Sequence, residues 1–145
     1  MGNLEKEINS KFDSEHQKAF LNIKFTSSYF STIADKIFIK YNISSQQYNV
    51  LRILRGAKKA IKVSTVKDRM IEKSPNTTRL MDKLVSKDLI IRSRREEDRR
   101  AVYVEITKNG LDLVNSINVN DEKVSLSKIS TEEAIELNRI LDKVR

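Results

Sequence analysis

Serine and threonine residues placed to begin helices recur along this chain, and they constrain its fold more than any other feature. A hydroxyl residue followed three positions later by Gln or Glu can form a capping box, which satisfies free backbone N–H groups at a helix start. Three pairs with this spacing stand at the start of a predicted helix: Ser14 with Gln17, Ser44 with Gln47, and Ser130 with Glu133. With only 3 Gly and 1 Pro, the chain also has few tight turns. The sequence therefore predicts a mainly α-helical protein.

Apolar residues follow the first two start signals at helical spacing. Between Phe20 and Tyr41 they recur every three or four residues, with one break at Ser27, which predicts one long amphipathic helix ended by Asn42 in the left-handed conformation. The segment from Val50 to Leu54 predicts a short second helix that ends at Gly56. A third short helix is expected over residues 64–71.

Both ends of the chain carry apolar residues that have few partners within a chain of this size. Leu4, Ile8 and Phe12 recur at fourfold spacing before the first capped helix. The last helix, which Ser130 begins, has the apolar stripe Ala134, Leu137, Ile140, Leu141 and Val144. Packing against a second copy around a twofold axis would bury these residues, so we expect a homodimer. The alternative is that the two ends pack on their own core.

A two-stranded pattern lies in the second half of the chain. Residues 90–94 and 101–106 are rich in β-forming residues, and the second run alternates apolar and polar positions. The stretch 95–100 between them is wholly charged, which predicts a β-hairpin with a charged tip. Ile61 is expected to add a single strand-like contact, and Thr107 can cap the helix that follows the hairpin.

Ser74 and Pro75 form the clearest helix start in the chain. Serine can cap, and proline at the first helical position has no N–H to lose. The gap between this helix and the one before it is only a few residues, which is typical of a helix-turn-helix. We expect the helix to bury its apolar residues and to expose Asn76, Thr77 and Arg79.

The charge of the chain is concentrated around these elements. Residues 55–110 contain 16 Lys and Arg and 8 Asp and Glu, a net charge of +8, which equals the net charge of the whole chain. An acidic polymer is the natural partner of such a segment, because neutralising phosphates releases counterions. The alternative is a solvated, lysine-rich surface.

Composition excludes several classes of function. The chain has no Cys, so it cannot form disulfides, thiolate metal sites or a nucleophilic thiol. Its single histidine, His16, rules out a His-rich metal site or a Ser-His triad within one chain. No Gly-rich phosphate loop or nucleophile–base pair is present, so we expect neither an enzyme nor a cofactor. The absence of long apolar runs predicts no membrane contact and a cytoplasmic location.

The helix that begins at Ser74 has side chains suited to reading DNA. Asn can make two hydrogen bonds to adenine and Arg two to guanine, whereas Thr can contact a base or the methyl group of thymine. Free N–H groups at a helix start also suit a phosphate. Solvation of an ordinary helix start is the alternative for Asn76 and Thr77.

The predicted hairpin has arginines on both sides of an acidic tip. An arginine on such a loop can enter a minor groove, where the electrostatic potential is most negative. Glu96, Glu97 and Asp98 would be repelled by phosphates. We therefore expect Asp98 to pair with a neighbouring Arg and to leave Arg99 or Arg100 to reach the groove. A surface cluster of ion pairs is the alternative.

Several motifs resemble the multiple-antibiotic-resistance regulator (MarR) family of winged helix-turn-helix proteins. The run from Ile43 to Leu51 resembles a helix opening of that family, and the run from Ser74 to Leu84 resembles its recognition helix. Asp98-Arg99-Arg100-Ala101-Val102, followed by Ile106-Thr107-Lys108-Asn109-Gly110, is similar to its wing signature. The resemblance covers about residues 14–145.

The resemblance implies a homodimeric transcription regulator, usually a repressor, that binds a palindromic operator. It implies that the first and last helices form the dimer, that Arg100 enters the minor groove, and that Asp98 orients the wing. It also implies, for many members, release of DNA when a small aromatic ligand binds between the dimer and DNA-binding regions. The usual glycine after the recognition helix is Asp88 here, so we expect a slightly different turn.

These observations give a mainly α fold with a small β-hairpin wing and three regions. Residues 1–42 are expected to form an arm and a dimerisation helix, residues 43–107 the DNA-binding region, and residues 108–145 further dimerisation helices. The predicted DNA contacts are Ser74, Asn76, Thr77, Thr78, Arg79, Arg94, Arg95, Arg99 and Arg100. The competing interpretation is a winged-helix module that binds proteins without reading DNA sequence.

Overall fold

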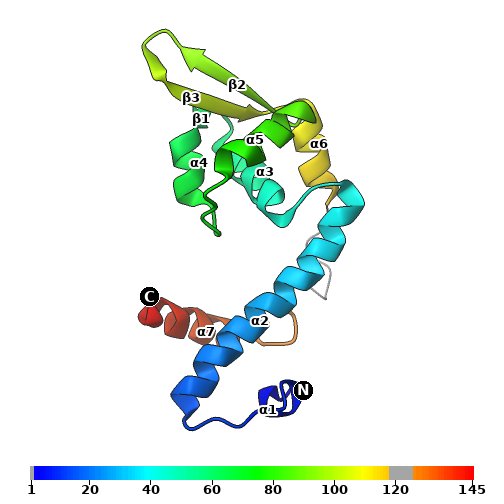
Figure 1. Ribbon diagram of the computed structural model, residues 1–145, viewed down its shortest axis with the longest axis vertical. Coiled ribbons are helices and arrows are strands. Elements are labelled where there is room, and N and C mark those ends of the chain that lie inside the picture. The colour runs from blue at the N-terminus through cyan, green and yellow to red at the C-terminus, as the bar shows by residue number, and fades with distance from the viewer. Residues whose placement is uncertain (1, 118–125) are drawn as a thin grey trace.

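In the computed structural model, which describes residues 2–117 and 126–145, one long helix connects two lobes (Figure 1). The lower lobe holds the short N-terminal helix α1, the first half of α2, and the C-terminal helix α7. The upper lobe holds all the other helices and the sheet. In chain order the elements are α1 (Leu4–Glu7), α2 (Glu15–Phe38), η1 (Ile39–Tyr41), α3 (Ser45–Ala57), β1 (Ile61–Lys62), α4 (Val63–Arg69), α5 (Thr77–Ser86), β2 (Ile90–Arg95), β3 (Asp98–Ile106), α6 (Lys108–Ser116) and α7 (Thr131–Val144).

The helix starts are formed largely as the sequence predicts. Ser44 and Ser130 form complete capping boxes with Gln47 and Glu133. Ser14 accepts a hydrogen bond from the N–H of Gln17, but the Gln17 side chain accepts from Asp13 rather than from Ser14. After α2, a single turn of 3₁₀-helix ends at Asn42, whose φ of 55° is the predicted left-handed conformation.

The core of the upper lobe surrounds α3. Leu51 and Leu54 are fully buried between the other helices and the sheet, and an amphipathic helix of this length owes its stability to such packing. The rings of Phe38 and Tyr48 stack with their centroids 4.5 Å apart, which attaches the end of α2 to this core.

The sheet has three antiparallel strands in the order β1-β3-β2. Ile61 pairs with Val104, which confirms the predicted single strand contact. The hairpin of β2 and β3 has an irregular register between Arg94 and Arg95 and turns at Glu96 and Glu97. The mainly helical fold with a small hairpin is thus as predicted.

Three predicted helix boundaries are wrong. Helix α4 ends at Arg69 rather than at residue 71, because Met70 is already extended, with ψ of 136°. Helix α3 does not end at Gly56 but continues to Ala57, which still packs against the core, and Lys58 takes the left-handed conformation with φ of 54°. Helix α5 begins at Thr77 rather than at Pro75. The N–H of Asn76 donates to Ser74 Oγ and the Thr77 hydroxyl donates to the Ser74 carbonyl, so a side-chain-stabilised turn precedes the helix.

The turn after α5 keeps the conformation expected for glycine although its residue is Asp88. Asp88 has φ of 56°, so the expected difference in this turn is wrong. Asn109 Nδ2 donates to the Asp88 carboxylate at 2.8 Å, and the Thr107 hydroxyl donates to the Asp88 carbonyl at 2.7 Å. These two bonds stabilise a conformation that costs little for Asp compared with other non-glycine residues.

None of the described helices is long and apolar enough to cross a membrane.

Candidate nucleic-acid interface

Helix α5 and the hairpin lie together at the end of the molecule farthest from α1 (Figure 1). Arg92 on β2 links the two elements. Its Nη2 atom lies 2.6 Å from Asp82 Oδ1 and donates to the Thr78 carbonyl oxygen at 3.3 Å. Because Thr78 and Asp82 are one helical turn apart, a single guanidinium holds one side of α5 against the strand.

A groove of about 660 Å³ separates the hairpin from α4 and α5. Strand alternation explains its chemistry, because Arg92 and Arg94 share the face of β2 that is turned toward α5. Apolar atoms of Met81 and Val102 also line the groove, between cationic and hydroxyl groups. The full lining is Lys62, Val63, Ser64, Thr78, Met81, Arg92, Ser93, Arg94, Arg100, Ala101 and Val102.

The start of α5 presents most, but not all, of the predicted reading residues. Asn76, Thr78 and Arg79 are exposed, and Ser74 is half-buried. Thr77 is 1% exposed, so its prediction as a base contact is wrong. Its hydroxyl donates a hydrogen bond to the Ser74 carbonyl oxygen at 2.7 Å, and its methyl group is buried. Thr77 therefore stabilises the helix start and is not on the exposed face of α5.

On its other side α5 borders a second, polar groove of about 450 Å³, opposite the start of α3. Asn76, Arg79 and Lys83 line this groove. Lys83 was missed by sequence reasoning. Its position four residues after Arg79 and seven after Asn76 places all three on one helix face, and that spacing is the signal that could have identified it.

The hairpin arginines have different surroundings. Arg95 lies on the outer face of the sheet, turned away from α5, and its guanidinium lies 4.2 Å from the ring centroid of Tyr103. Arg94 Nη1 donates to the Arg99 carbonyl at 3.1 Å, which braces the irregular part of the hairpin. The structure thus places Arg94 at the groove and separates Arg95 from the other predicted contacts.

Asp98 does not pair with a neighbouring arginine, so that prediction is wrong. Its carboxylate lies 3.2 Å from Lys62 Nζ. Since β1 and β3 are paired, Lys62 lies across the sheet within reach of the start of β3, and a contact over 36 positions replaces the expected local one. This ion pair attaches the outer part of the hairpin to the rest of the domain.

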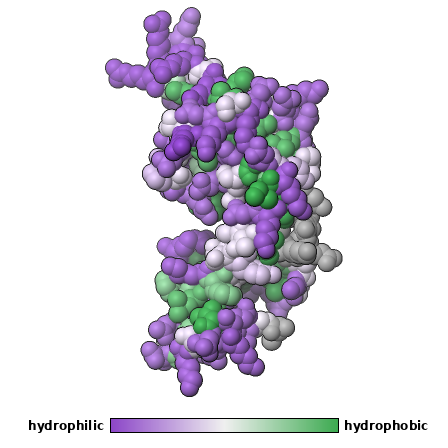
Figure 2. Space-filling model, turned by 45° about the vertical axis from the view of Figure 1, so that its right-hand side comes forward, coloured by the Kyte–Doolittle hydropathy of each residue, from purple (hydrophilic) through white to green (hydrophobic). Residues whose placement is uncertain are grey.

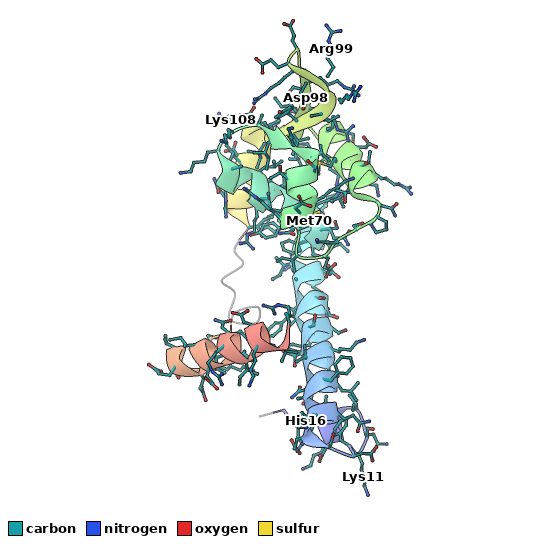
Figure 3. The ribbon with its side chains drawn as sticks, turned by 90° about the vertical axis from the view of Figure 1, so that its left-hand side faces the viewer. Lys11, His16, Met70, Asp98, Arg99 and Lys108 are labelled. Atoms are coloured by element: carbon teal, nitrogen blue, oxygen red, sulfur yellow. The ribbon has the colours of Figure 1, made fainter. Side chains whose placement is uncertain are left out.

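Arg99 and Arg100 form no ion pair with any residue in 2–117 or 126–145. Figure 3 shows Arg99 beside Asp98 on the hairpin, at the opposite end of the molecule from His16. Arg100 lines the groove next to α5. Two exposed arginines without an acidic partner are the cations of the hairpin best placed to meet phosphates or a groove floor.

Within residues 2–117 and 126–145, no group of three or more His, Asp or Glu residues could hold a metal ion.

The lower lobe carries an apolar patch bordered by charged residues. Figure 2 shows hydrophobic atoms gathered on this lobe and hydrophilic atoms over most of the upper one. Leu4 is buried against its own chain, but α7 has no buried residue at all. The large exposed apolar side chains of α2 and α7 are Phe20, Ile23, Tyr29, Ile135, Leu137, Ile140 and Val144. A fourteen-residue amphipathic helix without a buried residue requires another surface to cover it.

Comparison with known proteins agrees with this architecture. Residues 32–117 match the family model described as transcriptional regulator SarA/Rot. The HTH-type transcriptional regulator PecS of Dickeya dadantii is 32% identical over 115 residues, which cover 76% of this chain and 69% of PecS.

Two solved structures share the fold. A MarR transcription factor from Planctomyces limnophilus is 32% identical and superimposes with a TM-score of 0.68 over 91% of this chain and 98% of its own. A mutant of MarR from E. coli, complexed with operator DNA, is 22% identical and superimposes with a TM-score of 0.78 over 99% of each chain. The winged helix-turn-helix predicted from the sequence is confirmed.

Proposed function

The chain belongs to the MarR family of winged helix-turn-helix transcription regulators and is a DNA-binding regulator; we propose that it is a homodimeric repressor of a palindromic operator. The observation that carries the proposal is the joint surface of α5 and the hairpin. Asn76, Thr78 and Arg79 would meet base edges in a major groove, with Ser74 at the adjoining phosphate. Arg99 and Arg100 would reach the next minor groove, and Arg94 and Lys83 would contact the backbone between them.

The apolar surface of the lower lobe supports the homodimer. Leu137, Ile140 and Val144 lie on one side of α7 and are 38%, 45% and 69% exposed. A second copy offers the same stripe, and a twofold axis would bury both. The axis would also place two α5 helices about 34 Å apart on one face of a duplex, which is the spacing a palindromic operator requires.

Repression follows if the bound dimer blocks the start of transcription, and a small aromatic ligand would relieve it. The groove between α5 and the hairpin supports this second step, because Arg92, Arg94 and Arg100 would attract an aromatic carboxylate and its apolar wall would cover the ring. That position differs from the site between the dimer and DNA-binding regions expected above. Titrating benzoate into the protein–DNA complex tests this step. We expect the protein to release the DNA, and unchanged DNA binding at saturating benzoate would contradict a ligand of this class.

Selection of bound duplexes from random double-stranded DNA tests the proposed function. We expect enrichment of an inverted repeat whose half-sites are centred about one helical turn apart, since each protomer would read one half. The enriched duplex should bind at least about a thousandfold more tightly than a scrambled duplex of the same composition. Enrichment of no sequence would contradict the proposal and favour the protein-binding module instead.

A further inference from the structure

An acidic residue stands within the basic surface that is proposed to meet DNA. Asp82 projects from the middle of α5 with its side chain 57% exposed. A carboxylate so placed repels phosphates, and it contributes little to folding, because exposed ion pairs stabilise proteins only weakly. The role of Asp82 must therefore lie in the geometry of its contact with Arg92.

That contact fixes the angle between the two reading elements. Arg92 Nη2 is shared between Asp82 Oδ1 at 2.6 Å and the carbonyl of Thr78 at 3.3 Å, so it engages both a side chain and the backbone of α5. The guanidinium is planar and its donors diverge at fixed angles, so it resists rotation about the helix more than a single point charge would.

A second ion pair holds the hairpin nearer its tip. Lys62 and Asp98 are 3.2 Å apart and join β1 to the start of β3. The hairpin is thus attached to α5 near its base and to β1 near its turn. A rigid pair of elements that must enter two grooves together loses less freedom on binding than a hinged pair.

We propose that Asp82 is a positioning residue for DNA reading, which acts through Arg92 to hold the hairpin at the angle that matches α5 to the major groove and Arg100 to the minor groove. This inference rests on the proposed function. The proposal can be recognised in binding measurements. The negative charge of Asp82 weakens binding to every duplex, whereas its contact with Arg92 strengthens binding to the correct duplex only. Removing its charge should therefore move specific and non-specific affinity in opposite directions.

The variant Asp82→Asn tests this on the full-length protein, with two probes: the duplex enriched from random DNA, and a scrambled duplex of the same composition. Loss of one negative charge should raise affinity for the scrambled duplex by about twofold. Affinity for the enriched duplex should fall by about threefold to tenfold, because the hairpin must be ordered on binding. The ratio of the two affinities is the decisive readout, since a general loss of folding would lower both.

Asp68→Asn is the matched control. Asp68 is exposed on the neighbouring helix α4 and forms no ion pair within residues 2–117 and 126–145, so its loss should raise both affinities equally. Asp82→Glu keeps the carboxylate and should retain most of the ratio. If Asp82→Asn and Asp68→Asn raise the affinity for both duplexes equally, Asp82 has no positioning role. Arg92 would then act only as a direct contact to DNA. A wild-type protein without preference between the duplexes would overturn the proposed function itself.

Discussion

Replacing Ile140 with Glu is expected to convert the protein from dimer to monomer at micromolar concentration. Ile140 lies on the apolar stripe of α7 and is 45% exposed in the single chain, so the change should leave the protomer folded. In the proposed dimer the twofold axis would bury two carboxylates without partners, at a cost of about 3 kcal/mol or more each. Sedimentation equilibrium measures the mass directly. Affinity for the enriched duplex should fall at least about a hundredfold, because two linked half-site contacts become one.

Ile135→Glu is the control on the same helix. Ile135 is 64% exposed and precedes Leu137 by two residues, which places it about 200° around α7 from the stripe. The same substitution there should leave the mass of the dimer unchanged. If Ile140→Glu sediments as a dimer and binds the duplex like the wild type, α7 does not form the interface.

Gly110→Ala is expected to lower the free energy of unfolding by about 2 to 3 kcal/mol, as overpacking of a rigid site does. A Cβ atom at Gly110 would stand 2.2 Å from the carbonyl oxygen of Leu89 and 2.7 Å from Ile106 Cγ1. Backbone cannot rotate away as a side chain can, so α6 would have to move off the turn after α5. The N–H of Gly110 also donates to Thr107 Oγ1, and that helix cap would shift with it.

Gly56→Ala is expected to raise the free energy of unfolding, opposite to Gly110→Ala. Gly56 lies within α3, and beyond the backbone of its own helix no atom lies within 4 Å of the place that a Cβ would take. Alanine should therefore raise the free energy of unfolding by about 0.5 to 1 kcal/mol, through its higher helix propensity alone. Urea unfolding of both variants at one protein concentration makes the comparison, since the stability of a dimer depends on concentration. Equal effects of the two substitutions would contradict the close approach at Gly110.

Local signals in the sequence predicted most of the fold. Ser44 and Ser130 begin their helices where the capping boxes place them, and Asn42 ends the helix before α3. These features depend on residues three or four positions apart. The prediction that α3 ends at Gly56 was wrong. A glycine near a helix end usually terminates the helix, whereas here the packing of Ala57 against the core extends α3 by one more residue.

The candidate site was less predictable, because its contacts join distant parts of the chain. Asp98 has three arginines close in sequence, yet its partner is Lys62, which only the pairing of β1 with β3 brings near. Thr77 was expected on the exposed face from its place at the helix start. It lies four residues before Met81 and seven before Leu84, however, so helical spacing puts it on the same face as these two buried residues. The concentration of charge in residues 55–110 did point to the segment that forms the candidate interface, since it depends on composition alone.

Methylation protection of the enriched duplex tests most directly whether α5 and the hairpin read adjacent grooves. Dimethyl sulfate modifies guanine N7 in the major groove and adenine N3 in the minor groove, so one experiment reports both. We expect the wild-type protein to protect both in each half-site, with twofold symmetry. Arg100→Ala should lose the minor-groove protection and keep the major-groove one, whereas Arg95→Ala, on the outer face of the sheet, should keep both. Minor-groove protection that survives in Arg100→Ala, or protection confined to one groove in the wild type, would contradict the account.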